Sequence, residues 1–226
     1  MNAIAKQLLN QSPFLKVIAG IENFDADSIR SVAQAADGVA PAIDLSADED
    51  SVRWVKNNTS LSVFVSSLDP AVLAQSIEWG TDWVELGNFQ PIYDRGALIN
   101  PDMVLGWTRE LVSLVQGRAG ICVTIPGILS LEEQIELAQA VEALGADLIQ
   151  IENITGDVSH VRPIAEAVSV PVMLSGRLNQ ENLSQALTTG ADAYGIGSVI
   201  RQAQDQDAMR ALISQLNAQL TAISVR

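Results

Sequence analysis

GADLIQIE at residues 145–152 and GADAYGIGS at residues 190–198 are built alike. In each, Gly-Ala-Asp ends a helical segment, and a short run rich in β-branched or aromatic residues follows. The glycine suits the left-handed position that ends a helix, and the aspartate suits the tight turn after it. Gly80-Thr81-Asp82 and Ala36-Asp37-Gly38 stand in the same place before two other runs. This recurrence predicts repeated units in which a helix leads into a strand.

Short β-rich runs alternate with helical segments over the whole chain, which is typical of βαβ units and a parallel sheet. We expect eight strands, beginning near Leu15, Gly38, Leu61, Trp83, Arg118, Asp147, Val170 and Ala193. Their even spacing favours a closed ring over an open sheet. The sequence therefore predicts one (β/α)8 TIM-barrel domain over residues 1–226, with residues 1–13 forming a short helix that covers one barrel end.

Composition narrows the classes of partner. The chain has 226 residues and a formal net charge of -14, which repels nucleic acid and anionic membrane surfaces. Cys122 is the only cysteine, so disulfides and cysteine metal clusters are excluded and a reducing, cytoplasmic compartment is expected. We expect neither a secretory leader nor a membrane span, because no apolar stretch is long enough. Whether copies of the chain form a homo-oligomer stays open.

Strand alternation predicts which side chains point into the barrel, because apolar β-branched residues mark the face that helices cover. On this rule Lys16, Asp44, Glu85 and Glu152 face the interior. Ionisable groups are rarely buried without partners, so four in one lumen indicate ion pairing or function. We take these four as the candidate catalytic residues.

One lysine against three carboxylates leaves an excess of negative charge. Three explanations stay open: a carboxyl group keeps its proton, a divalent cation binds between Asp44, Glu85 and Glu152, or some groups reach solvent at the barrel mouth. Lys16 comes early in its strand, so a structural ion pair with Glu85 or Glu152 competes with a catalytic role.

The last two strands resemble the phosphate-binding end of other barrels. Gly176 and Arg177 follow the seventh strand, and Gly197 and Ser198 follow the eighth. Glycine N–H groups and a short helix start can cradle a phosphate there. Arg201 could add positive charge, although an arginine in such a loop is often a solvated surface group.

Further polar residues at the predicted mouth are candidates for substrate contact. The segment 87–101 is long for a connection in a compact domain, which suggests a lid or a substrate-binding loop. The candidates are Asn23, Asn88, Tyr93, Arg95, Thr124, Asn153 and Ser175.

Several motifs together resemble one family. They are KVIAGIENFD at residues 16–25, AIDL at 42–45, VELGNF at 84–89 with YDRG at 93–96, VTIP at 123–126 with LEEQ at 131–134, and DLIQIE at 147–152. The order and extent of these motifs are similar to the hypothetical chloroplast reading frame 23 group of cyanobacteria and algal plastids. The resemblance implies an aldolase-type or ribulose-phosphate-binding-type barrel in a cyanobacterial cytosol or plastid stroma, and no reaction.

Three functions remain open. The first is an acid/base isomerase or epimerase acting on a small phosphorylated metabolite, with Glu152 or Asp44 moving the proton. The second is a lyase or aldolase that uses a Lys16 Schiff base or a divalent cation. The third is a barrel that binds a ligand or regulates a partner without catalysis.

Overall fold

The computed structural model describes residues 1–20, 22–87, 89 and 93–222. Within these ranges the strands are β1 (Phe14–Gly20), β2 (Ala42–Ser46), β3 (Ser62–Ser67), β4 (Trp83–Leu86), β5 (Gly120–Ile125), β6 (Leu148–Glu152), β7 (Val172–Ser175) and β8 (Ala193–Ile196). The helices are α1 (Ala3–Leu9), α2 (Ala26–Ala36), α3 (Glu49–Asn58), α4 (Pro70–Ser76), η1 (Ile77–Trp79), α6 (Pro101–Val115), α7 (Leu131–Leu144), α8 (Val161–Ala167), α9 (Leu183–Ala186), α10 (Ser198–Arg201) and α11 (Gln206–Thr221).

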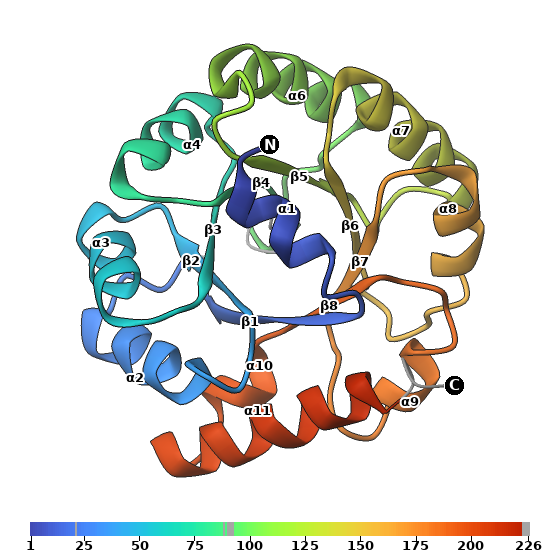
Figure 1. The fold of residues 1–226 in the computed structure, drawn as a ribbon. Helices are drawn as coiled ribbons and strands as arrows, with labels where there is room; N and C mark the ends of the chain where they lie inside the picture. Colours follow the sequence, from blue (N-terminus) through green and yellow to red (C-terminus); the bar gives the residue numbers. More distant parts are fainter. Residues whose placement is uncertain (21, 88, 90–92, 223–226) are drawn as a thin grey trace.

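The strands form a closed parallel barrel in chain order, with β8 paired to β1 (Figure 1). The helices form a ring around it, and the predicted (β/α)8 barrel is thereby confirmed. In the part of the chain that the structure describes, no helix is both long and apolar enough to cross a membrane.

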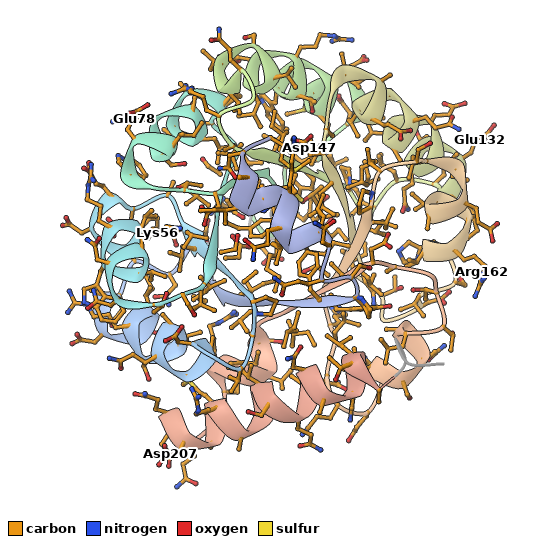
Figure 2. The ribbon with its side chains drawn as sticks, viewed as in Figure 1. Lys56, Glu78, Glu132, Asp147, Arg162 and Asp207 are labelled. Carbon is orange, nitrogen blue, oxygen red and sulfur yellow. The ribbon has the colours of Figure 1, made fainter. Side chains whose placement is uncertain are left out.

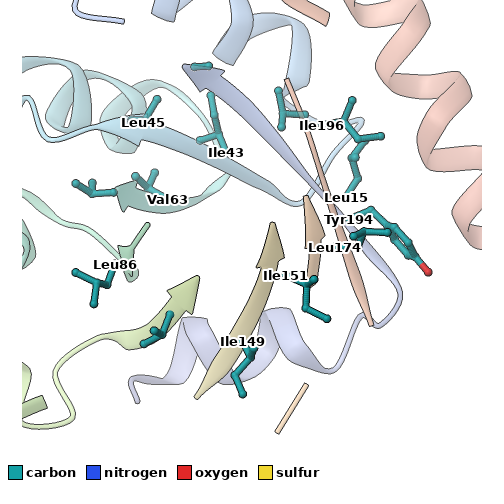
Figure 3. Close-up of a cluster of buried hydrophobic side chains, with 14 of the residues drawn as sticks. Leu15, Ile43, Leu45, Val63, Leu86, Ile149, Ile151, Leu174, Tyr194 and Ile196 are labelled. Carbon is teal, nitrogen blue, oxygen red and sulfur yellow. The ribbon is translucent and has the colours of Figure 1, made fainter. Parts of the chain in front are cut away.

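The main core lies between the barrel and the helix ring. The outward-facing apolar residues of the strands, such as Ile43, Val63 and Ile149, are fully buried there (Figure 3). Burying such side chains contributes about 1.5–3 kcal/mol each, so this layer supplies most of the drive to fold.

A smaller apolar cluster closes the amino-terminal end of the barrel. Helix α1 lies across this end and buries Ala5 and Leu8 against inward-facing Phe14, Phe64 and Trp83 (Figure 1). The Phe64 and Trp83 rings stack with centroids 5.1 Å apart. This plug fills the lower barrel, so the polar interior residues lie toward the carboxyl ends of the strands.

Seven of the eight strands begin within two residues of the predicted position, and β2 is the exception. We predicted that it begins near Gly38, but the turn after α2 continues: the N–H groups of Val39 and Ala40 donate to the Ala36 carbonyl oxygen. The strand therefore begins at Ala42.

The aspartates before the even-numbered strands bind the preceding strand. Gly80, Gly145 and Gly190 have φ of +104°, +109° and +88°, as expected for helix-ending glycines. The carboxylates of Asp82, Asp147 and Asp192 accept hydrogen bonds from the N–H groups of Val63, Ile121 and Val172. Figure 2 shows Asp147 inside the helix ring, whereas Glu78, Glu132 and Asp207 point outward. Each aspartate thus ties the start of one strand to the next.

Replacing Asp82 by alanine is expected to lower the free energy of unfolding by about 1–3 kcal/mol, because the buried N–H of Val63 would lose its acceptor. Asp82 is 3% exposed and also accepts from Lys56 Nζ at 2.8 Å. Urea unfolding measures the loss, with Glu136→Ala on the exposed side of α7 as the control. A loss no larger than that of the control would show that this contact does not hold the strands.

Candidate functional site

A cavity of about 650 Å³ opens at the carboxyl ends of the strands. Its wall includes these candidates from the sequence: Asn23, Asp44, Glu85, Thr124, Glu152, Asn153, Ser175, Gly176, Arg177, Gly197 and Ser198. Residues from all parts of the chain therefore meet in one pocket. It lies at the end of the barrel at which TIM-barrel enzymes have their active sites.

Beneath the cavity floor, Lys16 on β1 is fully buried and is not part of the wall. Its ammonium group donates to Glu85 Oε2 and, at 2.9 Å, to Gln150 Oε1, and it lies 3.4 Å from Asp44 Oδ2. It also lies 4.9 Å from the centre of the Phe64 ring, above the apolar plug. Lys16 therefore forms the buried ion pair that the sequence left open as an alternative to catalysis, and its partners are Glu85 and Asp44.

The environment keeps Lys16 charged. Burial alone lowers the pKa of its ammonium group, but the nearby carboxylates of Asp44 and Glu85 outweigh burial and raise the pKa above its ordinary value. A Schiff base requires the neutral amine with room for a carbonyl carbon. Neither condition holds for Lys16.

Asp44 differs from Glu85 in having one oxygen without a hydrogen bond. Its Oδ1 accepts from Ser66 Oγ at 2.7 Å, whereas the buried Oδ2 has no hydrogen-bond partner. Burial raises the pKa of Asp44 to about 7, with the Glu85 charge adding to the rise and Lys16 opposing it. Asp44 is therefore a cavity-wall carboxyl group that can take or release a proton near neutral pH.

Gln150 links the buried ion cluster to the next strands. Its Nε2 donates to Glu85 Oε1 at 2.9 Å and to Thr124 Oγ1 at 3.1 Å. Neither Gln150 nor Ser66 is among the candidate site residues from the sequence, although alternation indicates that Gln150 faces the interior, because Ile149 and Ile151 face the helices. The same alternation marks Ser66, because Val63 and Val65 on β3 face the helices.

The structure gives no support to the alternative of a divalent cation between Asp44, Glu85 and Glu152. Among the residues the structure describes, no three acidic, cysteine or histidine side chains are grouped so that they could hold a metal ion. The Lys16 ammonium group lies between Asp44 and Glu85 and compensates one negative charge of this pair.

The fourth candidate, Glu152, is not part of the ion cluster. It ends β6 and its Oε2 accepts from Tyr93 Oη at 3.0 Å and from the Gly127 N–H at 2.9 Å. Burial raises the pKa of Glu152, although the hydrogen bonds from Gly127, Tyr93 and the Phe89 backbone oppose the rise. The predicted meeting of four ionisable groups thus holds for three, and Glu152 forms a separate pair nearer the mouth.

The segment after β4 contacts the mouth at two points. Tyr93 reaches Glu152, and the exposed Arg95 pairs with Glu22 at 2.9 Å. The predicted contact residue Asn88 lies outside the described residues. Asn23 uses its amide within its own loop, donating to the Ala19 carbonyl oxygen and accepting from the Asp25 N–H.

The loops after β7 and β8 form the opposite wall. Ser175 Oγ is 3.4 Å from the Gly195 carbonyl oxygen, and Gly176 packs on the backbone of Asn153 so closely that a side chain would collide. Ser198 is the first residue of α10, so the helix itself offers its N–H no acceptor.

Arg201 is fixed in this wall more firmly than the sequence suggested. Its Nη1 donates to the Ile18 carbonyl oxygen at 2.8 Å. The guanidinium passes over Gly197, where an added Cβ would collide with it, and the side chain also runs beside Gly20 at ordinary contact distance. Burial lowers the pKa of Arg201. Among the described residues, neither Arg177 nor Arg201 pairs with a carboxylate, although the chain is strongly acidic.

Solved structures with the same fold confirm the predicted type of barrel. Thiamine phosphate pyrophosphorylase from Pyrococcus furiosus superposes with a TM-score of 0.68 at 21% identity, covering 96% of this chain and 98% of its own. For 3-hexulose-6-phosphate synthase from Salmonella typhimurium the TM-score is 0.72 at 12% identity, covering 91% and 99%. At these identities the likeness establishes the fold.

Sequence comparison gives the family. The model of the family described as "Protein of unknown function (DUF561)" matches residues 1–163 and 151–226. "Uncharacterized protein ycf23" from Antithamnion sp. is 34% identical over 217 residues, which is 84% of this chain and 78% of that protein. The resemblance drawn from the motifs is confirmed, and the chain belongs to the DUF561 family together with the ycf23 proteins.

Proposed function

We propose that this barrel binds a small phosphorylated metabolite and moves one of its protons, as a sugar-phosphate isomerase or epimerase does. The observation that carries the proposal is the polarity of the cavity. Arg177 and Arg201, without carboxylate partners among the described residues, lie on the β7–β8 side. Asp44, whose Oδ2 accepts no hydrogen bond and lies 3.4 Å from Lys16 Nζ, lies on the β2 side.

The phosphate part of the proposal rests on the arginine wall. A guanidinium held by a backbone carbonyl, as Arg201 is by Ile18, is preorganised for an anion and loses little freedom when one binds. The N–H of Ser198 adds a donor beside it. The similar barrels named above carry phosphate in the names of their substrates or products, which fits this assignment.

The acid/base part rests on Asp44. A general acid or base works best when its pKa lies near the working pH, and the pKa of Asp44 is raised to about 7. Glu152 has a raised pKa as well, but Tyr93 and Gly127 already donate to its Oε2. Asp44 is therefore the better proton carrier.

Sodium borohydride is expected to leave no stable adduct when added with ribulose 5-phosphate, because Lys16 is buried, charged and shared between Glu85 and Gln150. Intact-protein mass spectrometry measures the result. An adduct that maps to Lys16 would contradict the acid/base isomerase or epimerase and favour a Schiff-base lyase.

Replacing Arg201 by methionine is expected to weaken binding of ribose 5-phosphate by about 10- to 100-fold, since hydrogen bonds to charged groups contribute about 1.5–3 kcal/mol. Ligand at a hundredfold excess over its dissociation constant stabilises a protein by about 2.7 kcal/mol, so thermal unfolding reports the binding. Arg109→Met on α6 removes an equal charge from an exposed position and serves as the control.

Two experimental outcomes would redirect the proposal, one in ligand binding and one in proton exchange. If neither inorganic phosphate nor any sugar phosphate stabilises the wild type, the phosphate site is wrong. If ligands bind but no proton exchanges, the barrel is a ligand-binding protein without catalysis. We further propose a plastid stroma or cyanobacterial cytosol as its compartment, on the ground of its ycf23 relatives.

A further inference from the structure

Asn153 has a buried amide group with one unused donor. The residue directly follows β6, is 1% exposed and lines the cavity. Its Oδ1 accepts from the Gly156 N–H at 2.8 Å, whereas Nδ2 has no hydrogen-bond partner. The Gly156 N–H is a donor, so the amide atom that faces it must be the oxygen. The amide orientation is thereby fixed, and Nδ2 is the atom without a hydrogen bond.

The backbone holds Asn153 in place. Its N–H donates to the Ser175 carbonyl oxygen at 2.7 Å, and its own carbonyl packs against Gly176. A buried donor without an acceptor costs free energy, so a rigid residue that keeps one indicates a ligand atom that completes it. That atom has to be a hydrogen-bond acceptor.

The barrel places this donor opposite Asp44, whose Oδ2 accepts no hydrogen bond and lies 3.4 Å from Lys16 Nζ. In a closed ring of eight strands in chain order, β2 and β6 are four strands apart in either direction. Asn153 and Asp44 therefore approach the cavity from opposite walls. The arginine wall of β7 and β8 lies between β6 and β2 in the ring, so a ligand anchored there by its phosphate extends into the cavity with Asn153 on one side and Asp44 on the other.

We propose that Asn153 Nδ2 donates to the carbonyl oxygen of the substrate, which is a phosphorylated α-hydroxy ketone or aldehyde. This deepens the proposed function and rests on it. Asp44 Oδ2 takes the proton from the carbon next to the carbonyl group. The electron pair of that C–H bond forms a carbon–carbon double bond, and the π pair of the carbonyl group moves to its oxygen. The resulting enolate oxygen stays hydrogen-bonded to Asn153, which stabilises it more than the neutral carbonyl.

The test compares ribulose 5-phosphate with 2-deoxyribitol 5-phosphate by calorimetry. The two ligands share the five-carbon chain and the phosphate, but at carbon 2 the first has a carbonyl oxygen and the second has no oxygen to accept a hydrogen bond. Asn153→Asp keeps an oxygen for the Gly156 N–H but has no donor when ionised. Its new charge weakens both dianions alike, so the ratio of the two dissociation constants reports the hydrogen bond.

Wild-type protein is expected to bind the ketone about tenfold more tightly than the polyol, as a hydrogen bond of ordinary strength provides. In Asn153→Asp the ratio falls to about one. Asn153→Ala, which removes the whole amide, gives the same ratio and replaces the first variant if that one fails to fold.

Equal affinities in the wild type, or a preference that survives in the variants, would overturn the role of Asn153. If the wild type binds inorganic phosphate and both sugar phosphates but shows no preference, only this inference fails. If it binds none of the three ligands, the proposed function fails with it.

Discussion

Lys16→Met is expected to lower the free energy of unfolding by about 3–5 kcal/mol at pH 8, which is the usual cost of leaving buried charges unpaired. The methionine fills a similar volume above Phe64, so the loss comes from charge and not from a cavity. Asp44 and Glu85 are 1% and 0% exposed, and no water can replace the ammonium group without rearrangement. Urea unfolding, followed by circular dichroism, measures the loss.

Acid should reduce this loss. As the pH falls below 7, Asp44 takes a proton and no longer needs a cation, so the stability of Lys16→Met should move toward that of the wild type. The double variant Lys16→Met with Glu85→Gln should regain part of the stability at pH 8, because one of the two buried charges is gone. A loss below about 1 kcal/mol at pH 8 would contradict the view that these groups are desolvated.

The sequence predicts the barrel well because each strand carries its own local pattern. Val63 and Val65, or Ile149 and Ile151, alternate with inward-facing residues, and this period is independent of the rest of the fold. The start of β2 was missed because Val39 and Ala40 are apolar but belong to the turn that follows α2. Local composition does not separate these two cases.

The site was predictable only as a set of inward-facing residues. Alternation places Lys16, Asp44, Glu85 and Glu152 inside, but which carboxylate reaches Lys16 depends on the depth and stagger of the strands. Glu152 ends its strand and turns to Tyr93, which belongs to a distant loop. Such pairings become visible only in three dimensions.

Arg201 illustrates the same limit. Sequence shows an arginine in a short helix after the last strand, which is most often a solvated group. The structure adds the carbonyl oxygen of Ile18 and the space above Gly20 and Gly197, contributed by the two ends of the chain that meet where β8 pairs with β1.

Asp44→Asn is expected to slow proton exchange on ribulose 5-phosphate by about 10²–10⁴-fold, the contribution typical of a general base. The asparagine keeps the shape and the acceptor for Ser66 but cannot take a proton. Loss of the carbon-bound hydrogen in D₂O, followed by NMR, measures the rate, and Asp50→Asn on the exposed face of α3 is the control. Phosphate affinity should not fall, because the variant removes neither a positive charge nor the contact that holds Arg201. Exchange at the wild-type rate would exclude Asp44 as the base.

The pH dependence separates a base from a merely structural carboxylate. A base acts in its ionised form, so the rate of proton exchange by the wild type should rise through pH 7, where Asp44 loses its proton.

The stability of the wild type should change in the opposite direction. The pKa of Asp44 in the folded state lies above its ordinary value of 3.8, so the folded state binds more protons than the unfolded state between about pH 4 and 7. The stabilisation from protonated Asp44 is complete below pH 4 and is lost as the pH rises through 7. Asp44→Asn lacks this loss, so its stability relative to the wild type should increase with pH. If the difference in free energy of unfolding between the variant and the wild type is the same at pH 5 and pH 8, Asp44 does not titrate in this range.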